Sequence, residues 1–189
     1  MAVTLHRAGA GDRPAILSLM DAARGAHLND AERAQQGFVQ GQMDESSLAR
    51  MQAGPGVFVA RDGSMLAGFA MTSTASVAGS GLAVATAQAA AEAVPELPLD
   101  KIFLYGPVVV DRRYQGQGLL TRLLLHVCME LRAQFALGAL FIDRANQKSL
   151  AIHRHYPMDE RASFEFKQRS YVVFTFSPAK VVNHYGLRC

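Results

Sequence analysis

The clearest chemistry in the sequence lies in a glycine-rich segment, Asp111-Arg-Arg-Tyr-Gln-Gly-Gln-Gly-Leu-Leu120. It follows an apolar run of strand length, Ile102 to Val110, and precedes a run with helical spacing that starts at Gly118. Glycines allow a ligand to approach the backbone closely, and a helix start presents unpaired N–H groups with a partial positive charge. Arg112 and Arg113 add positive charge at the rim. The segment therefore predicts a phosphate site.

The type of phosphate ligand follows from what this segment lacks. A nucleoside-triphosphate loop ends in Gly-Lys-Ser or Gly-Lys-Thr, and neither is present. A dinucleotide fingerprint needs three glycines directly after a strand, but residues 111–115 precede Gly116 and the third glycine is missing. Asp143, at the end of the next predicted strand, could still mimic the acid that binds a ribose. A nucleotide-dependent oxidoreductase, which would bind NAD, therefore stays an alternative.

The segment resembles the Gln/Arg-x-x-Gly-x-Gly/Ala loop of the GCN5-related N-acetyltransferases (the GNAT family), and two registers fit. Arg113-x-x-Gly116-x-Gly118 matches literally. Gln115-x-x-Gly118-x-Leu120 fits the usual distance from strand to helix better, but has Leu where Gly or Ala is usual. The resemblance implies that backbone amides of the loop hold the pyrophosphate of acetyl-coenzyme A (acetyl-CoA) as a co-substrate. The loop residues that it implies for binding are Arg113, Gln115, Gly116, Gln117, Gly118 and Leu119.

A second motif follows the loop at the distance that is usual in this family. Asn146-Gln-Lys-Ser-Leu-Ala-Ile-His153 resembles the family's Asn-x-x-Ala…Tyr segment. The resemblance implies that Asn146 and Ser149 contact the pantetheine or adenosine end of acetyl-CoA, whereas helix capping is the alternative role. The opening segment from Leu5 to Asp12, the strands within 57–73 and the final hairpin are also similar to the family. The resemblance thus extends over most of the chain.

The predicted strand before the loop carries Gly106-Pro107 in its middle. Proline cannot donate a ladder hydrogen bond and glycine marks a bulge or close approach, so we expect this strand to splay from its neighbour. In the resembled family such a splay, between the fourth and fifth strands, admits the pantetheine arm. The resemblance implies that the backbones of Val108, Val109 and Val110 bind the cofactor, and that one N–H polarises the acetyl carbonyl.

The residues for proton transfer are also suggested by the resemblance. The family usually has a Tyr seven residues after the Asn, as the acid that protonates the departing thiolate; here that position is His153. Imidazole can donate only while protonated, and its free pKa is about 6.5. We expect His153 to be this acid, with Tyr156 close to it; a histidine on a helix surface is the alternative. A general base is not evident, and Tyr105, Asp111, Asp143 or a water chain could serve.

Hydrophobic periodicity and turn residues predict the elements that must position these groups. Their order indicates a mixed α/β fold with helices packed on a sheet. The family resemblance further implies a mostly antiparallel sheet, helices on both faces, and splayed fourth and fifth strands. Strands are predicted over 3–7, 57–61, 65–73, 102–110, 139–143, 162–167 and 171–176. Helices are predicted after Asp12 and Asp44 and over 30–38, 86–94, 118–135 and 146–155.

Composition limits the remaining function classes. The length of 189 residues predicts a single domain, 1–189, which the family resemblance implies is an acetyltransferase domain; residues 74–100 are an insertion, a mobile lid or a plain surface connection. The net charge of +3 is small and spread along the chain, which argues against nucleic acid. We expect no membrane segment, because the longest uncharged stretch is poor in large apolar residues. Cys128 and Cys189 form neither a metal-ligand spacing nor a disulfide framework, so no metal and a cytoplasmic location are expected.

The family resemblance therefore implies an acetyl-CoA-dependent N-acetyltransferase that moves an acetyl group to a primary amine by direct attack on the thioester. The acceptor is a small-molecule amine or a protein amine, and a homodimer is compatible with this reading. A catalytically silent acyl-CoA sensor or interaction domain on the same fold is the alternative.

Overall fold

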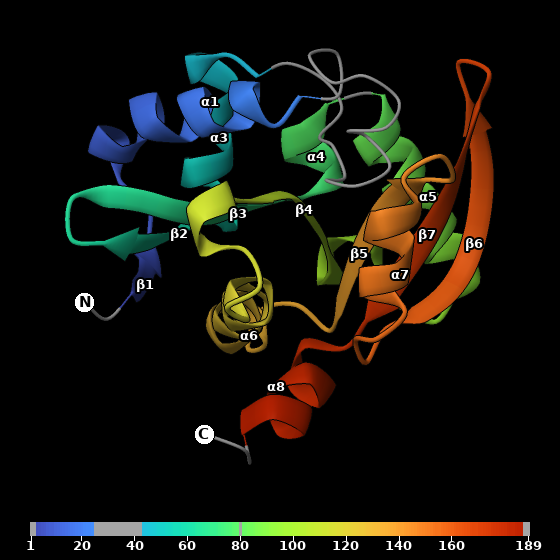
Figure 1. The fold of residues 1–189 in the computed structure, drawn as a ribbon. Coiled ribbons are helices and arrows are strands. Elements are labelled where there is room, and N and C mark those ends of the chain that lie inside the picture. The colour runs from blue at the N-terminus through green and yellow to red at the C-terminus, as the bar shows by residue number, and fades with distance from the viewer. Residues whose placement is uncertain (1–2, 25–42, 80, 187–189) are drawn as a thin grey trace.

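The sheet that organises this protein has seven strands, in the order β1-β2-β3-β4-β5-β7-β6. The computed structural model describes residues 3–24, 43–79 and 81–186 (Figure 1). Neighbouring strands are antiparallel except β4 and β5, which are parallel. The strands are β1 (Thr4–Arg7), β2 (Gly56–Asp62), β3 (Met65–Ser73), β4 (Ile102–Val110), β5 (Leu137–Asp143), β6 (Asp159–Phe166) and β7 (Arg169–Phe176). The predicted mixed, mostly antiparallel sheet is confirmed.

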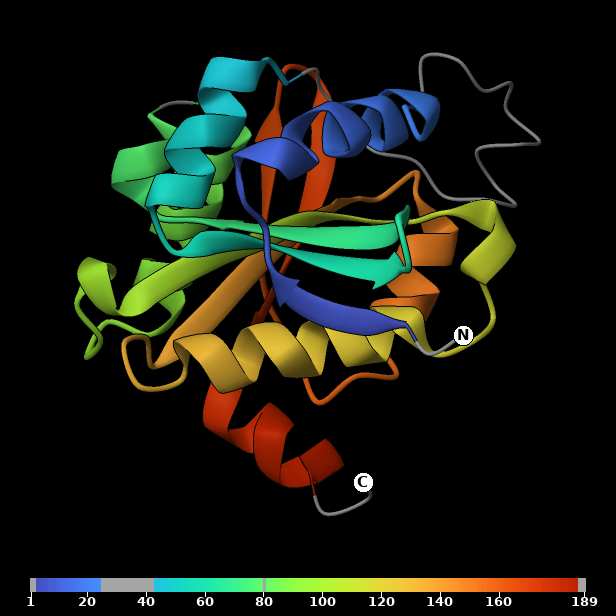
Figure 2. The same ribbon diagram turned by 90° about the vertical axis from the view of Figure 1, so that its left-hand side faces the viewer.

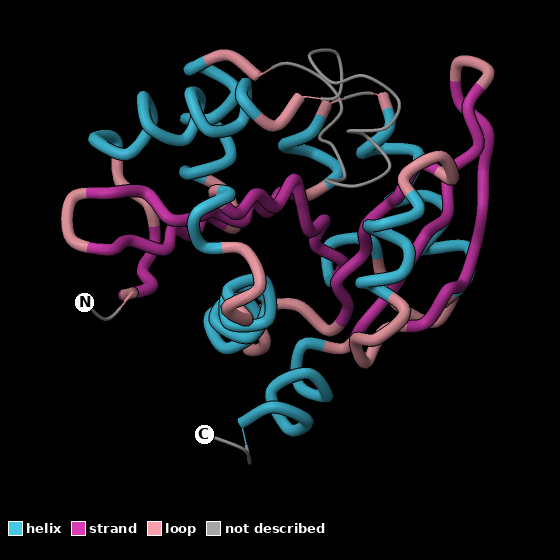
Figure 3. Tube along the Cα trace, in the orientation of Figure 1, coloured by secondary structure: helices cyan, strands magenta, loops and turns pink. Residues whose placement is uncertain are grey.

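Helices cover both faces of this sheet, as predicted (Figure 2). Helices α1 and α3 lie on one face, and α6 and α8 lie on the other. Figure 3 shows all helices in cyan around the strands. The α-helices are α1 (Arg13–Ala22), α3 (Glu45–Ala53), α4 (Ala75–Ala78), α5 (Leu82–Ala93), α6 (Leu119–Leu131), α7 (Gln147–His153) and α8 (Pro178–Gly186). Short 3₁₀ turns are Ala10–Asp12, Leu99–Lys101 and Arg112–Tyr114.

Several helix boundaries follow from local chemistry. The Asp44 side chain caps α3 by accepting a hydrogen bond from the Ser47 N–H at 2.7 Å. Helix α6 starts where predicted but ends at Leu131, because the chain turns there and buries Phe135. Helix α7 likewise ends earlier than predicted, and α8 was not predicted. The helical piece expected over 30–38 lies outside the described residues.

The segment between β3 and β4 differs most from expectation. Helix α5 starts at Leu82 rather than at 86, and it packs against β4, β5, β6 and β7. Ala87 and Ala90 are buried there against Ile102 and Leu104. Small alanine side chains let the helix approach the sheet closely, but they give the sequence a weak hydrophobic contrast. The segment therefore forms part of a packed layer, not a plain surface connection.

The predicted splay between β4 and β5 is confirmed. The two strands pair only through Ile102, Phe103 and Leu104 of β4. Beyond Leu104, β4 stays paired with β3 alone, with an irregular register opposite the Gly106–Pro107 peptide bond, which is cis. The side of β4 that faces β5 is thereby open next to the glycine-rich loop.

No helix in the described parts of the chain combines the length and apolar character needed to cross a bilayer.

Candidate active site

Two adjoining cavities occupy the splay between β4 and β5. The first, of about 580 Å³, lies between the end of β4, the glycine-rich loop, the start of α6, and α7. Its described lining residues are Ala23, Tyr105, Val108, Val109, Val110, Tyr114, Gln115, Gly116, Gly118, Leu119, Leu120, Thr121, Asn146, Lys148, Ser149, Ile152, His153 and Tyr156. The second, of about 460 Å³, lies between β4, β5, α5 and α7. Both are lined by Tyr105, Val108, Asn146, Ser149 and His153.

At the end of β4, every second peptide group points toward the first cavity. The Asp111 N–H donates to the Ala67 carbonyl of β3 at 2.9 Å, and the carbonyl of Val109 also faces β3, close to Gly68. Because peptide groups alternate in direction along a strand, those of Val108 and Val110 point the other way, toward the splay. The Gln115 side chain agrees with this, since its Nε2 donates to the Val110 carbonyl at 3.3 Å.

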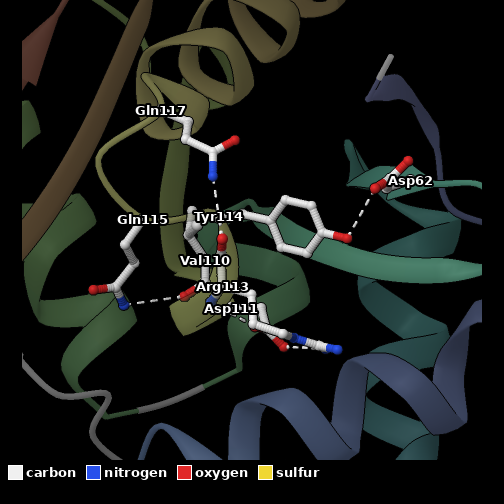
Figure 4. A network of polar contacts seen from close by, with 7 residues as sticks. All are labelled: Asp62, Val110, Asp111, Arg113, Tyr114, Gln115 and Gln117. Carbon is white, nitrogen blue, oxygen red and sulfur yellow. Dashed lines mark hydrogen bonds and ion pairs between the residues drawn. The ribbon is translucent and has the colours of Figure 1, made fainter. Parts of the chain in front are cut away.

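The glycine-rich loop is held by its own side chains (Figure 4). The guanidinium of Arg113 folds back on Asp111, with Nη2 to Oδ2 at 2.8 Å and Nε to Oδ1 at 2.9 Å. The Tyr114 hydroxyl donates to Asp62 Oδ2 at 3.1 Å, which ties the loop to β2. Gln117 Nε2 donates to the Arg113 carbonyl at 3.1 Å. These contacts therefore hold the loop in its shape.

The structure separates the two registers of the glycine motif. Gln115, Gly116 and Gly118 line the first cavity, whereas Arg113 and Gln117 do not. Both glycines have positive φ, 75° and 72°, which favours glycine. Gly118 is the N-cap of α6, so the N–H groups of Leu119 and the next two residues have no acceptor within the helix. The first residue of one register, Gln115, thus lines the cavity, whereas the first residue of the other, Arg113, does not.

Further lining residues were not anticipated from the sequence. Lys148 is a positively charged residue in the lining of the first cavity, and Thr121 adds a hydroxyl in the first turn of α6. Lys148 lies inside the Asn146–His153 motif. A positive charge in a motif expected beside a phosphate site could have identified it from the sequence. Thr121 and Ile152 carry no comparable signal, because only the folded chain brings α6 and α7 to the same cavity.

Asn146 has the helix-capping role weighed from the sequence, and cofactor contact by Asn146 and Ser149 stays a prediction. The Asn146 side chain caps α7, because its Oδ1 accepts a hydrogen bond from the Ser149 N–H at 3.2 Å. Both residues also line both cavities. Helix capping therefore positions the residues that the motif places beside the cofactor.

His153 is half-buried and lines both cavities, so it is not a plain surface histidine. Its Nδ1 lies 2.7 Å from the Ser149 carbonyl oxygen, and a carbonyl can only accept a hydrogen bond. Nδ1 therefore carries the proton, and Nε2 has the lone pair in the neutral ring. Burial lowers the pKa of His153 below its usual 6.5, and the bond to Ser149 opposes this only in part. The ring is thus neutral near pH 7 and poorly suited to donate a proton.

Tyr156 lines the first cavity alone. Its hydroxyl lies 3.2 Å from the Thr121 hydroxyl, and its ring contacts those of His153 and Tyr185 with centroids 5.9 and 6.4 Å apart. Burial raises the pKa of Tyr156, so the phenol stays protonated at neutral pH. Tyr156 lies beyond the end of α7, so it does not share a helix face with His153. The turn after the helix and the packing of α8 position it instead.

The three side chains considered as a general base are engaged otherwise. Burial raises the pKa of Tyr105 well above its usual value, so it does not ionise near neutrality. The hydrogen bond from Arg113 lowers the pKa of Asp111, which makes its carboxylate a weaker base. Asp143 is bound by Arg169 Nη1 at 3.0 Å and by the Ala145 N–H at 2.9 Å.

Comparison with known proteins shows which solved structures have a similar fold. No family model and no curated protein sequence matches the chain. Solved structures do match: yncA from Salmonella typhimurium, named as an acetyltransferase and solved with its cofactor acetyl-CoA, has a TM-score of 0.64 at 17% identity, over 94% of this chain and 95% of that one. The ribosomal-protein-S18-alanine N-acetyltransferase from Escherichia coli gives 0.61 at 17% identity, over 93% and 94%. A spermidine N-acetyltransferase SpeG chimera from Vibrio cholerae and hSSAT gives 0.61 at 13%, over 97% and 99%.

Proposed function

We propose that the protein, which has the fold of the GCN5-related N-acetyltransferases, binds acetyl-CoA in the first cavity and transfers its acetyl group to a primary amine. The observation that carries this proposal is that β4 and β5 stop pairing after Leu104, directly beside the glycine-rich loop. A strand edge that is open next to a helix N-terminus suits a ligand with amides at one end and phosphates at the other. A doubly wound parallel sheet, which dinucleotide binding by the fingerprint requires, is not the architecture found here.

The phosphates fit the start of α6. The backbone from Gly116 to Thr121 offers N–H groups at a helix N-terminus, and Lys148, which lines the same cavity, supplies a positive charge. Arg113 takes little part, because its guanidinium is paired with Asp111 outside the cavity. The register that begins at Gln115 is therefore the one that we propose for the pyrophosphate.

The open edge of β4 fits the pantetheine arm and the acetyl group. The peptide groups of Val108 and Val110 face the splay and can bind amides as an added strand would. Acetyl-CoA supplies the thioester that an amine attacks. A Val108 or Val110 N–H donates a hydrogen bond to the oxygen that becomes negative during the attack, an effect worth about 3 kcal/mol in well-studied cases.

Proton transfer is divided between two side chains. His153 Nε2, at the boundary of the two cavities, accepts the proton that the amine nitrogen loses as the C–N bond forms. The Tyr156 hydroxyl, in the first cavity, donates its proton to the thiolate as the C–S bond breaks. Exchange with water then deprotonates His153 and reprotonates Tyr156. This division reverses the acid role predicted for His153 from the family motif.

Two measurements on the full chain test the proposal. Acetyl-CoA at 100 times its Kd should stabilise the protein by about 2.7 kcal/mol in thermal unfolding, whereas NAD should not. Coenzyme A thiol should then be released when primary amines are added. Stabilisation by NAD alone would contradict the proposal. Stabilisation by acetyl-CoA without thiol release from any amine would favour the silent acyl-CoA sensor.

A further inference from the structure

The second cavity has the chemistry of an apolar binding site. Among its described lining residues, β5 contributes Phe141 and Ile142, β4 contributes Pro107, and α5 contributes Leu82. Met51 of α3 adds a flexible thioether side chain that adapts to apolar ligands. A volume of about 460 Å³ is within the range of small-molecule sites.

Charge is nearly absent from this lining. Of the described residues that line the second cavity, none is Lys or Arg, and the sole carboxylate belongs to Asp143. That carboxylate is 7% exposed and forms an ion pair with Arg169. The Thr86 hydroxyl donates to the Leu82 carbonyl at 2.7 Å, so its proton is also engaged. A ligand with a charge at its far end would therefore meet no counterion among these residues.

We propose that the second cavity holds the body of the acceptor, and that the acceptor is a primary monoamine with an uncharged aliphatic or aromatic body. This inference rests on the proposed function, because the amine nitrogen must reach His153 between the two cavities. Apolar surface gains from burial here, whereas a second ammonium or a carboxylate would be desolvated without a partner. Polyamines and amino acids are thereby disfavoured.

A matched series of six-carbon amines isolates the charge at the far end. Hexylamine, 1,6-diaminohexane and 6-aminohexanoate share the reacting amine and the chain, and differ only in their other terminus. With acetyl-CoA saturating, we expect kcat/KM for hexylamine to exceed that for either charged analogue by about tenfold or more. 2-Phenylethylamine should be accepted at a rate comparable to hexylamine.

The substitution Leu82→Glu tests whether the second cavity sets this preference. Leu82 is the first residue of α5, where a carboxylate is compatible with the helix dipole, so folding should be retained. The new charge should lower kcat/KM for hexylamine, raise it for 1,6-diaminohexane, and change their ratio by about tenfold or more. Gln88→Glu is the matched control, because it adds the same charge on the exposed side of α5, outside the cavity lining. Its ratio should equal that of the wild type.

Acetyl-CoA binding, followed by thermal shift, separates this inference from the proposed function. If acetyl-CoA does not bind, the proposed function fails and the acceptor inference fails with it. If acetyl-CoA binds but the three amines react equally, or a charged analogue or a peptide is preferred, the inference alone is overturned. It is also overturned if Leu82→Glu and Gln88→Glu give the same ratio, or if hexylamine neither reacts nor binds.

Discussion

The two nitrogen atoms of the His153 ring have different environments, and this difference decides what the residue can do. Nδ1 donates to the Ser149 carbonyl, which fixes the tautomer, while the ring itself lines both cavities. A neutral ring with an available Nε2 is a base. The family pattern alone, which has a Tyr at this position, points to an acid. At the residue scale, one hydrogen bond therefore changes the expected role.

The substitution His153→Gln should lower kcat by about 10²–10⁴-fold while acetyl-CoA affinity is retained, because general base catalysis contributes that range. The pKa of His153 is lowered by burial, so the wild-type kcat should fall with decreasing pH only below 6.5, as the ring becomes protonated. This acidic limb should vanish in the variant. Single-turnover rates from pH 5 to 9 measure both effects.

Tyr156→Phe is the control for this assignment. It should also lower kcat, because the thiolate loses its proton donor, but the acidic limb should remain. His153→Tyr distinguishes base from acid, because a phenol, with an ordinary pKa of about 10, cannot replace a neutral imidazole as base. If His153→Tyr has a higher kcat than His153→Gln and extends activity to higher pH, His153 is the acid that the family pattern predicts.

At the scale of elements, α6 depends on a glycine for its first turn. Gly118 is the N-cap with φ 72°, a conformation that side chains with a Cβ rarely adopt, although the space around it is open. Gly118→Ala should therefore destabilise the fold by about 1 kcal/mol or more, and Gly118→Val by a larger amount. The strain also moves the N–H groups proposed to bind phosphate.

The expected result for Gly118→Ala is a melting temperature lower by a few degrees and a weaker stabilisation by acetyl-CoA. Thermal unfolding with and without acetyl-CoA measures both quantities. Gly63→Ala is a matched control, because it also has positive φ and open space but lies in the β2–β3 turn. It should lose stability and keep acetyl-CoA affinity. Equal loss of affinity in both variants would mean that the phosphates bind elsewhere.

The pairing of β5 with β7 depends on a second glycine. A Cβ on Gly138 would overlap the ring of Phe176, which packs edge-on against Phe103 and Tyr105. Gly138→Ala should therefore destabilise the protein by about 1–3 kcal/mol through overpacking. Urea unfolding measures this loss. The double variant Gly138→Ala/Phe176→Leu should recover part of it, and an unchanged midpoint in the single variant would contradict the packing.

At the scale of the whole molecule, two partly buried histidines connect stability to pH. Burial lowers the pKa of His126 and of His153 below 6.5. The unfolded chain therefore binds protons at 6.5 that the folded chain does not yet bind, so the free energy of unfolding falls as pH decreases below 6.5. This loss ends once the pH passes the lowered folded-state pKa values.

Urea unfolding at pH 7.5, 6.0 and 5.0 should show this decline, and His126→Gln should reduce it. Carboxylates affect stability in a separate, more acidic pH range. Hydrogen bonds lower the pKa of Asp44 and Asp111 below 3.8, so their contribution to the free energy of unfolding is lost only below that pH. A free energy of unfolding that is the same at pH 5.0 and 7.5 would refute the histidine effect.

The sequence by itself determined the features that depend on neighbours along the chain. The helix starts after Asp44 and at Asn146 were predicted, as were the two strands within 57–73 and the splay at the Gly106-Pro107 pair. Each of these follows from the hydrogen bonding or backbone preferences of a few adjacent residues. The mixed sheet and its helices followed from periodicity together with the family resemblance.

Only the tertiary structure decided which side chains meet. Lys148 and Thr121 line the same cavity because α6 and α7 flank the splay between β4 and β5, and Leu82 reaches the second cavity because α5 packs on the sheet. The tautomer of His153 depends on a contact, and its pKa on burial. Contacts between distant segments and the exclusion of water are properties of the packed chain, so local pattern does not contain them.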